Sequence, residues 1–290
     1  MKASTITYWT AFGAGMLLSA MLGAAETNKS QASTNKIEIS IFPDKNLEAA
    51  VRKFVFEKRD NDKPITDADV VSLSTINGSG MQIKNLSGLD KCKSLASLDL
   101  SKNQISKLDP LKDLKNIQYL NLANNQIEDV SPLSGISALQ YIELSNNKVK
   151  DIKPLANLTN MASLYLGNNQ VADVSPVLKM TRLSSLYLEN NRIESIKGIE
   201  ALRGLMSLSL SKNKITDISP IAGMDNLYWL FIDNNKISDL TPLATSAKKD
   251  YEGEKRFSPY LNLFVAGNPL NSLSKKQLST MKDYGTRVNN

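Results

Sequence analysis

Residues 139–160 have the sequence LQYIELSNNKVKDIKPLANLTN, and the spacing of aliphatic residues in this segment returns throughout most of the chain. From Leu139 to Leu158 the aliphatic side chains are separated by steps of 3, 2, 5, 3, 3 and 3 residues. These steps match neither the 3.6-residue period of a helix nor a long period of two. The close pair Ile142 and Leu144 indicates a short strand, and the later steps of three indicate an arc. The same spacing returns every 22 residues, and a fixed period of that length is typical of a solenoid.

The repeats begin at a constant interval. Seven regular ones start at Leu95, Ile117, Leu139, Met161, Leu183, Leu205 and Leu227, and irregular ones start at Leu73 and Tyr260. Ordering one repeat costs about 1–2 kcal/mol per residue in backbone entropy. Burying its aliphatic side chains returns only about 1.5–3 kcal/mol for each. A single repeat therefore cannot fold alone, and the repeats must stack on one another.

Every repeat except the irregular first one, which has Met81 there, carries an asparagine eight residues after its start. There the chain must turn away from the strand, and a side-chain amide can both donate to and accept from the backbone of that turn. We expect these asparagines to form a structural ladder: Asn103, Asn125, Asn147, Asn169, Asn191, Asn213, Asn235 and Asn268.

Prolines and aspartates also align between repeats. A shared position holds Pro110, Pro132, Pro154, Pro176, Pro220 and Pro242, and Gly198 replaces it in the fifth regular repeat. Proline there should prevent the arc from becoming a regular α-helix. Three residues before it lie Asp129, Asp151, Asp173, Asp217 and Asp239. They form either a set of metal ligands or, as we favour, caps of the following turn, because aspartate commonly caps helix starts.

The flanking segments define the domain organisation. Residues 1–25 are predicted to be an export signal peptide, because Lys2 is their only charge and an apolar run ends in small residues. An uncleaved anchor is the alternative. The further predicted boundaries are a disordered linker at 26–36, a helical N-terminal cap at 37–72, repeats at 73–270 and a C-terminal helical cap at 271–290.

Two flanking features support these boundaries. Apolar residues at helical spacing predict an amphipathic helix over residues 47–55, and Thr66-Asp-Ala-Asp69 resembles a capping box. The period breaks after Leu243, because Tyr260 follows Leu227 by 33 residues instead of 22. We interpret the additional 11 residues, within 246–259, as a surface loop, with a functional loop as the alternative.

The composition excludes several kinds of site. The 290 residues carry a formal net charge of +6, with no histidine and one cysteine. The commonest general base and metal ligand is therefore missing. Cys92 lies at a core position, so we expect a buried thiol. We predict no catalytic residue, no metal and no cofactor. Because the basic residues form no concentrated stripe, we expect no binding to nucleic acid.

The pattern Leu-x-x-Leu-x-Leu-x-x-Asn-x-Ile-x-x-Ile-x-Pro-Leu-x-x-Leu resembles the leucine-rich repeats of bacterial internalins over residues 40–270. The segments Ile41-Phe-Pro-Asp44 and Leu47-Glu-Ala-Ala-Val51 resemble the cap that opens internalin-like arrays. The resemblance implies an α/β solenoid, a right-handed curved array with a parallel sheet on the concave side, 3₁₀ turns on the convex side and helical caps at both ends. It also implies protein recognition on the concave face. The chain departs from the host-invasion internalins, because it shows no immunoglobulin-like region and no surface anchor.

The residues that flank each Leu-x-Leu pair should point outward from the sheet. They include seven of the 18 aromatic residues of the chain, four acidic residues and no basic one. Such a surface is typical of a recognition patch, although aromatic residues are also good strand formers. We predict that the partner-binding concave face contains Tyr119, Tyr141, Glu143, Tyr165, Tyr187, Glu189, Trp229, Phe231, Asp233 and Phe264.

The sequence therefore favours an exported bacterial protein that binds a protein or peptide with a basic or neutral patch and does not catalyse a reaction. We expect a secreted, periplasmic or surface-associated monomer, without stable membrane insertion once the signal is removed. One alternative is a carbohydrate-binding or structural protein of the cell envelope. A more distant alternative is a glycan hydrolase that uses Asp99, Glu143, Glu189 and Asp233.

Overall fold

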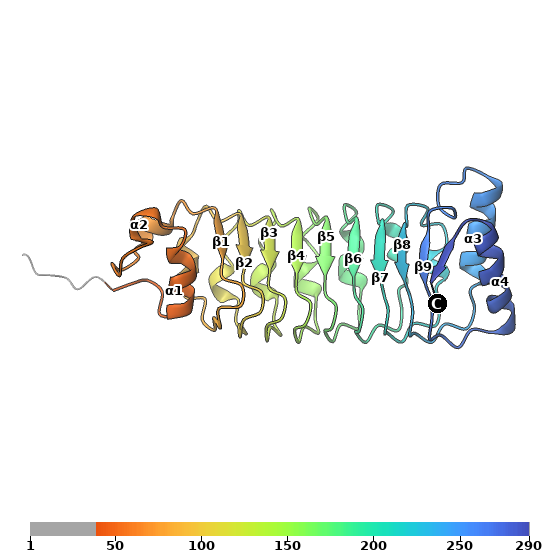
Figure 1. The fold of residues 1–290 in the computed structure, drawn as a ribbon, viewed down its shortest axis with the longest axis horizontal. Helices are drawn as coiled ribbons and strands as arrows, with labels where there is room; N and C mark the ends of the chain where they lie inside the picture. Colours follow the sequence, from red (N-terminus) through yellow and green to blue (C-terminus); the bar gives the residue numbers. More distant parts are fainter. Residues whose placement is uncertain (1–38, 290) are drawn as a thin grey trace, which may run out of the picture. The chain divides into compact units, whose positions relative to one another are not determined.

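The computed structural model describes residues 39–289, so the predicted export signal (1–25) and linker (26–36) lie outside the described residues. Within that range ten short parallel strands form one sheet, in the order in which they occur in the chain. Figure 1 shows the strands in front and the 3₁₀ turns, drawn fainter, behind them. The strands are β1 (Thr75–Asn77), β2 (Ser97–Asp99), β3 (Tyr119–Asn121), β4 (Tyr141–Glu143), β5 (Ser163–Tyr165), β6 (Ser185–Tyr187), β7 (Ser207–Ser209), β8 (Trp229–Phe231), β9 (Asn262–Phe264) and β10 (Arg287–Asn289).

Helical turns connect the strands. The α-helices are α1 (Lys45–Arg52), α2 (Asp67–Val70), α3 (Thr241–Glu252) and α4 (Ser272–Asp283). The 3₁₀ turns are Phe56–Lys58, Leu89–Lys91, Asp109–Leu111, Ser131–Leu133, Lys153–Leu155, Ser175–Lys179, Ile199–Ala201 and Ser219–Ile221. The predicted fold class, a leucine-rich repeat solenoid with one open parallel sheet and 3₁₀ turns, is confirmed. No helix within residues 39–289 is long and apolar enough to cross a membrane.

Equivalent positions of neighbouring coils stack directly on one another. Tyr119 pairs with Tyr141, and Tyr165 pairs with Tyr187, each 22 residues further along the chain. The register is kept even where the chain is longer, since Trp229 pairs with Asn262 across the added residues. Each outward column of the sheet is therefore a column of equivalent repeat positions.

The interior is a continuous aliphatic core. In the coil of residues 139–160 the seven aliphatic side chains are at most 1% exposed: Leu139, Ile142, Leu144, Val149, Ile152, Leu155 and Leu158. Their strand members alternate with outward residues, because successive side chains of a strand point to opposite faces. The members in the arc point inward at steps of three, which is the period of a 3₁₀ turn.

A buried asparagine joins each coil to the one before it. Asn169 donates from Nδ2 to the carbonyl oxygens of Leu144, Leu166 and Gly167, at 3.0, 3.1 and 3.2 Å. Its Oδ1 accepts the amide N–H of Val149 at 2.9 Å. Two of these four partners belong to the preceding coil, so one side chain pairs the polar backbone of two turns.

The N-terminal cap packs tightly on the first coil. An added Cβ on Gly78 would lie 3.0 Å from the Cβ of Ala50, so α1 takes the space that a leucine fills in later coils. Asp44 caps α1 and also accepts the amide N–H groups of Lys84 and Asn85, at 2.8 and 3.0 Å. The predicted helix over residues 47–55 is too long, because α1 ends at Arg52.

The added residues near 246–259 form a helix over much of their length, so the prediction of a loop is wrong there. α3 begins at Thr241 and continues to Glu252, with Pro242 in its first turn. Proline has no backbone N–H, but the N–H groups in the first turn of a helix have no intrahelical acceptor. Pro242 is therefore compatible with the start of this helix and does not interrupt it. Leu243 and Ala247 are buried, and α3 lies against α4.

The C-terminal segment also contains a strand that the sequence did not indicate. After α4, Gly285 adopts a left-handed φ of +94° and reverses the chain. β10 then pairs with β9, with Val288 opposite Leu263. The segment 271–290, predicted as a helical cap, is therefore a helix followed by an additional strand.

Gly198 holds the aligned proline position in a backbone conformation that requires glycine, as Gly88 does in the first, irregular coil with a φ of +98°. The φ of Gly198 is +94°, and an added Cβ would lie 2.6 Å from Cδ1 of Leu178. The 3₁₀ turn of this coil starts at Ile199, directly after Gly198, whereas Pro220 lies within the turn of the next coil. The fifth regular coil therefore follows a different backbone path.

We expect Asn169→Leu to lower the free energy of unfolding by about 3 kcal/mol, because it leaves several buried backbone groups unpaired. The change is measured by urea denaturation followed by circular dichroism. Asn157→Ala is the matched control, because Asn157 is exposed and should change the midpoint little. Equal midpoints for both variants would contradict the role given to the amide.

Gly198→Pro restores the residue of the other coils, yet we expect it to destabilise the protein. Proline holds φ near −65° and cannot adopt the observed +94°, so we expect a loss of about 2 kcal/mol or more in urea denaturation. Lys197→Ala serves as the control at the exposed neighbouring position. If Gly198→Pro instead raised the free energy of unfolding, this coil could adopt the backbone conformation of the proline-containing coils, which would contradict the prediction.

Candidate functional site

The outward side chains of the sheet include a row of stacked tyrosines. Here "sheet face" denotes the outward side chains of β2–β9 and of the second residue after each of these strands. Tyr119 and Tyr141 have ring centroids 4.5 Å apart, Tyr141 and Tyr165 5.3 Å, and Tyr165 and Tyr187 4.9 Å. The row changes column between β4 and β5, because the first two rings come from the first residue of their strands and the next two from the third.

The stack continues beyond β7. Tyr187 lies 6.4 Å from Phe231, and Phe231 lies 4.4 Å from Phe264. The rings of Trp229 and Phe231 are 6.2 Å apart and nearly parallel, with an angle of 7°. We call Tyr119, Tyr141, Tyr165, Tyr187, Phe231 and Phe264 together the aromatic ladder.

Small residues on β7 allow the ladder to cross that strand. Ser207, Ser209 and Ser211 are only 8%, 5% and 9% exposed although they belong to the sheet face. The Tyr187 hydroxyl lies 2.8 Å from Oγ of Ser207, so the tyrosine leans over β7. The rings of Tyr187 and Phe231, from the two neighbouring strands, lie 6.4 Å apart across β7.

The predicted binding residues are less accessible than the sequence suggested. Most are half-buried, because stacked rings shield one another, whereas Trp229 is 45% exposed. The inward residues of the strands are buried and the outward aromatics are partly accessible, whereas the outward serines of β7 are buried as well. The ladder therefore packs as a layer of its own over the sheet.

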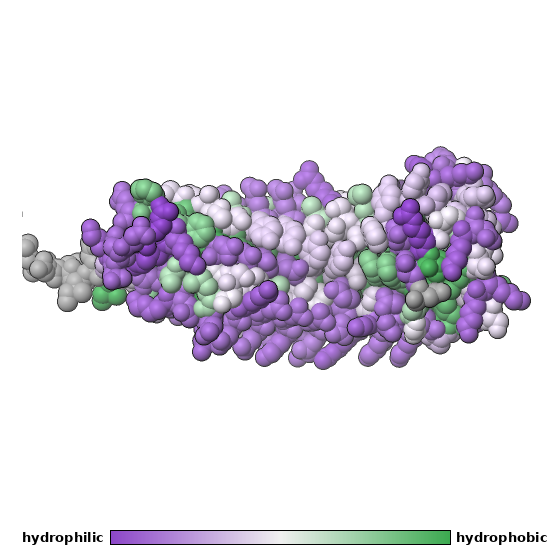
Figure 2. All heavy atoms as spheres, in the orientation of Figure 1, coloured by the Kyte–Doolittle hydropathy of each residue, from purple (hydrophilic) through white to green (hydrophobic). Residues whose placement is uncertain are grey.

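Three exposed residues beside the ladder were not identified from the sequence. Met206, Tyr228 and Tyr260 are 48%, 40% and 52% exposed, and the rings of Tyr228 and Tyr260 are 6.3 Å apart. Figure 2 shows apolar residues gathering near the end of the array that holds β8 and β9. The sequence did contain a signal for two of them. The residue directly before each strand is small or carries an amide in the earlier coils, whereas it is Met206 before β7 and Tyr228 before β8.

Three of the four sheet-face carboxylates accept hydrogen bonds from other residues of the protein. Asp99 accepts the Ser101 amide N–H and hydroxyl, at 2.9 and 2.7 Å. Glu143 accepts the Ser145 amide N–H at 2.7 Å. Asp233 accepts the hydroxyl of Ser211 and, at 2.7 Å, the side-chain amide of Asn234.

Glu189 differs from the other three carboxylates. Its Oε2 atom is shielded from solvent and has no hydrogen-bond partner within residues 39–289. The carboxylate lies over Gly167, where an added Cβ would overlap it. The glycine of the preceding coil thus leaves room for this side chain on the sheet face.

The hydroxyl of Tyr141 in the ladder remains a neutral donor. Burial, followed by the Glu143 carboxylate, raises the pKa of Tyr141 above its ordinary value. The phenol therefore keeps its proton throughout the physiological pH range and presents an O–H group.

The aligned aspartates cap the turns that follow them. Asp129 accepts the amide N–H of Ser131 at 2.8 Å, and Asp173 accepts that of Ser175 at 2.9 Å. These backbone bonds hold the pKa of both carboxyl groups below the usual range. No group of three or more potential metal-ligating side chains converges within the part of the chain that the structure describes.

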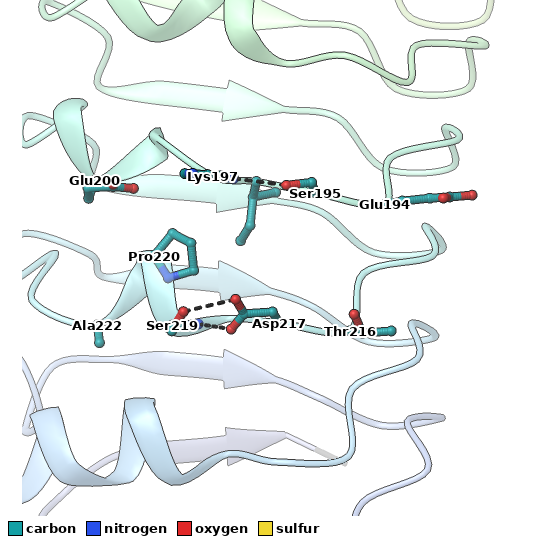
Figure 3. A pocket seen from close by; sticks show the side chains of 10 residues that line it. Glu194, Ser195, Lys197, Glu200, Thr216, Asp217, Ser219, Pro220 and Ala222 are labelled. Atoms are coloured by element: carbon teal, nitrogen blue, oxygen red, sulfur yellow. Dashed lines mark hydrogen bonds between the residues drawn. The ribbon is translucent and has the colours of Figure 1, made fainter.

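One hollow lies between two coils and away from the aromatic ladder. It has a volume of about 570 Å³ and lies where the Gly198 coil meets the next one, with Lys197, Glu200 and Pro220 in its lining. Figure 3 shows Asp217 beside Ser219, which donates to it from both its amide and its hydroxyl. A second hollow, of about 520 Å³, is lined by Lys249, Asp250 and Arg256 among others. Neither brings the sheet-face carboxylates together.

Cys92 lies in the core as expected from its position. It is fully buried, and burial, with a smaller contribution from Asp90, raises the pKa of its thiol to about 12. The thiolate is the reactive form of cysteine, so this side chain is inert in the folded protein.

Comparisons with known proteins identify the repeats. A family model described as "Leucine Rich repeats (2 copies)" matches residues 93–135, 115–157 and 137–179, and one described as "Leucine rich repeat" matches residues 181–237. The solved structure of internalin C2 from Listeria monocytogenes is 34% identical, with a TM-score of 0.67. The match covers 71% of this chain and 91% of that one. A comparison with curated proteins gives no match.

Two further solved structures share the fold. A leucine-rich repeat protein from Leptospira interrogans is 23% identical, with a TM-score of 0.59, over 70% of this chain and 56% of its own. The functional domain of InlJ from Listeria monocytogenes is 23% identical, with a TM-score of 0.59, over 82% of this chain and 53% of its own. At this identity the likeness concerns the fold alone.

We expect Cys92 to react with iodoacetamide at pH 8 at least about 100-fold more slowly in the native protein than in denaturant, since its raised pKa leaves little thiolate. The rate is measured by mass spectrometry of the intact chain. The control is the reaction rate of the same thiol in the protein unfolded in about 8 M urea. Comparable rates in both states would show that the thiol is accessible.

Proposed function

Because the chain belongs to the internalin-like family of bacterial leucine-rich repeat proteins, we propose that it is an exported protein that binds a protein partner through its sheet face, without catalysing a reaction. The fold is a protein-interaction scaffold. Export is supported by the sequence features of residues 1–25. The structural observation that carries the binding proposal is the aromatic ladder with the exposed ring of Trp229 at its end.

The ladder has the chemistry of a binding surface. Aromatic side chains supply large contact areas with little loss of conformational entropy, and residues that dominate binding energies are enriched in Trp and Tyr. Stacking already restricts the rings, with centroid distances of 4.4–5.3 Å along much of the row. A partner therefore meets a surface that is largely ordered before binding.

The centre of the binding surface is placed at β8. Trp229 is the most exposed sheet-face aromatic, and Tyr228 and Tyr260 extend the apolar surface beside it. Phe231 supports this region by stacking between Tyr187 and Phe264. The four acidic residues and the absence of bases on this face favour a partner with a basic or neutral patch.

The ring geometry favours a protein over a glycan. Sugars stack on open aromatic faces, but Tyr141 and Tyr165 each have a neighbouring ring on both sides. Trp229 is the ring most available for sugar stacking, which keeps a carbohydrate-binding or structural envelope protein as the second candidate. A hydrolase is less well supported, because Glu143 is engaged with the Ser145 amide and no described hollow surrounds the carboxylates.

We expect the double variant Trp229→Ala, Phe231→Ala to lose at least about tenfold in affinity for the partner, because two central aromatic contacts disappear. The immobilised protein is first used to capture binders from bacterial envelope extract and culture medium, and the captured protein is then titrated by isothermal calorimetry. A glycan array with the same protein tests the second candidate directly.

Phe56→Ala is the matched control. Phe56 is 80% exposed but belongs to the N-terminal cap, away from the sheet face. Circular dichroism establishes that each variant is folded. Unchanged affinity in the folded double variant would refute the placement at β8, and specific glycan binding without a protein partner would replace the proposal by the second candidate.

A further inference from the structure

Glu189 is the sheet-face carboxylate that the protein leaves without an internal partner. Asp99, Glu143 and Asp233 each accept at least one hydrogen bond from a neighbouring residue. Oε2 of Glu189 accepts none from residues 39–289 and is also shielded from water. A buried polar atom without a partner is rare in folded proteins, because it has lost its water and gained nothing in return.

Within residues 39–289 no lysine or arginine side chain forms an ion pair with this carboxylate. The ion pairs within residues 39–289 join residues of the caps and of the loop edges, and none includes Glu189. The sheet face itself carries no lysine or arginine, although the chain as a whole has a net charge of +6. Within the described residues Glu189 is thus a carboxylate without an ion pair, in a chain whose formal net charge is +6.

The surroundings of Glu189 suit a donor that arrives from outside. The side chain follows Tyr187 by two residues, so both point to the same face. The stacked rings of Tyr165 and Tyr187, 4.9 Å apart, occupy the same two coils as Gly167 and Glu189. Aromatic walls exclude water and strengthen a charge-assisted hydrogen bond formed beside them. The carboxylate occupies room that exists because position 167 is a glycine, since a Cβ there would overlap it.

We propose that Glu189, beside Tyr165 and Tyr187, is the point at which the sheet face receives the guanidinium group of an arginine side chain of its protein partner. This inference rests on the proposed binding function and specifies one determinant of it. Arginine fits better than lysine, because its planar fork donates two parallel hydrogen bonds to one carboxylate and is more weakly hydrated. Arginine is also enriched at protein interfaces, where lysine is depleted.

A peptide probe tests the inference without an identified partner. The blocked peptide acetyl-Gly-Gly-Arg-Gly-Gly-amide is titrated into the full chain labelled with ¹⁵N, and amide shifts are followed by two-dimensional NMR. The same peptide with citrulline in place of arginine has nearly the same shape without the charge, and a lysine peptide has the charge without the fork. We expect shifts at the amides of Gly167 and Glu189 with the arginine peptide, at least about fivefold weaker binding of the lysine peptide, and weaker binding still with citrulline.

Three variants separate the role of Glu189 from general charge. Glu189→Gln removes the charge at the proposed point, whereas Glu143→Gln removes the same charge from a carboxylate that already caps the Ser145 amide. Gly167→Ala keeps every charge but places a Cβ where the Glu189 carboxylate lies. We expect the arginine response to be lost in Glu189→Gln, reduced in Gly167→Ala and kept within about twofold in Glu143→Gln.

The outcomes distinguish this inference from the proposed function. The assignment of Glu189 is wrong if the arginine peptide does not change the amide shifts of Gly167 or Glu189. It is also wrong if Glu143→Gln and Glu189→Gln weaken binding of the arginine peptide equally. In that case partner binding that is sensitive to Trp229 still supports the binding function. If the arginine response is specific to Glu189 but the captured partner is insensitive to Trp229 and Phe231, the assignment stands and the placement at β8 fails.

Discussion

The solenoid depends on one side-chain amide in each coil after the first. At Asn169 a single buried amide serves three carbonyl oxygens and one N–H group, taken from two successive coils. The turn after each strand runs beside a core made of aliphatic side chains, where unpaired backbone groups have no access to water. The asparagine supplies their partners and, because it does so across coils, it also aligns each turn with the one before it. The register of the sheet, and with it the stacking of the aromatic ladder, follows from that alignment.

The repeat separates two tasks that most folds combine. Inward positions and the asparagine of a coil maintain the scaffold, whereas only the few outward positions of the strand face away from the core. The ladder shows that the separation is incomplete, since Tyr187 both stacks on Tyr165 and bonds to Ser207. Rings held in this way add to the order of the sheet and at the same time form its outer surface.

The sequence predicted what is encoded within a coil and missed what depends on contacts between distant segments. The core positions, such as Ile142 and Leu144, followed from spacing alone, because stacking repeats can bury only one set of side chains. α3 was missed, since its stability comes partly from Leu243 and Ala247 packing near α4, which lies outside any repeat. β10 was missed because a three-residue strand carries almost no periodic signal. The position of the Glu189 carboxylate depends on Gly167, 22 residues earlier, because a side chain there would overlap it. Both residues were visible in the sequence, but their contact depends on side-chain conformation.

The constant register has a consequence for how such a protein diversifies. Gain or loss of a whole coil by unequal recombination leaves every other coil with intact neighbours, because each turn needs only the coil beside it. The distance between any two surface residues on either side of the event then changes by one strand spacing, about 4.8 Å. The serine coil of β7 separates Glu189 from Trp229, so gain or loss of a coil there would change the spacing of these two residues together with every other pair across β7. Evolution of the binding surface can therefore proceed in discrete increments of length, with the interior unaffected.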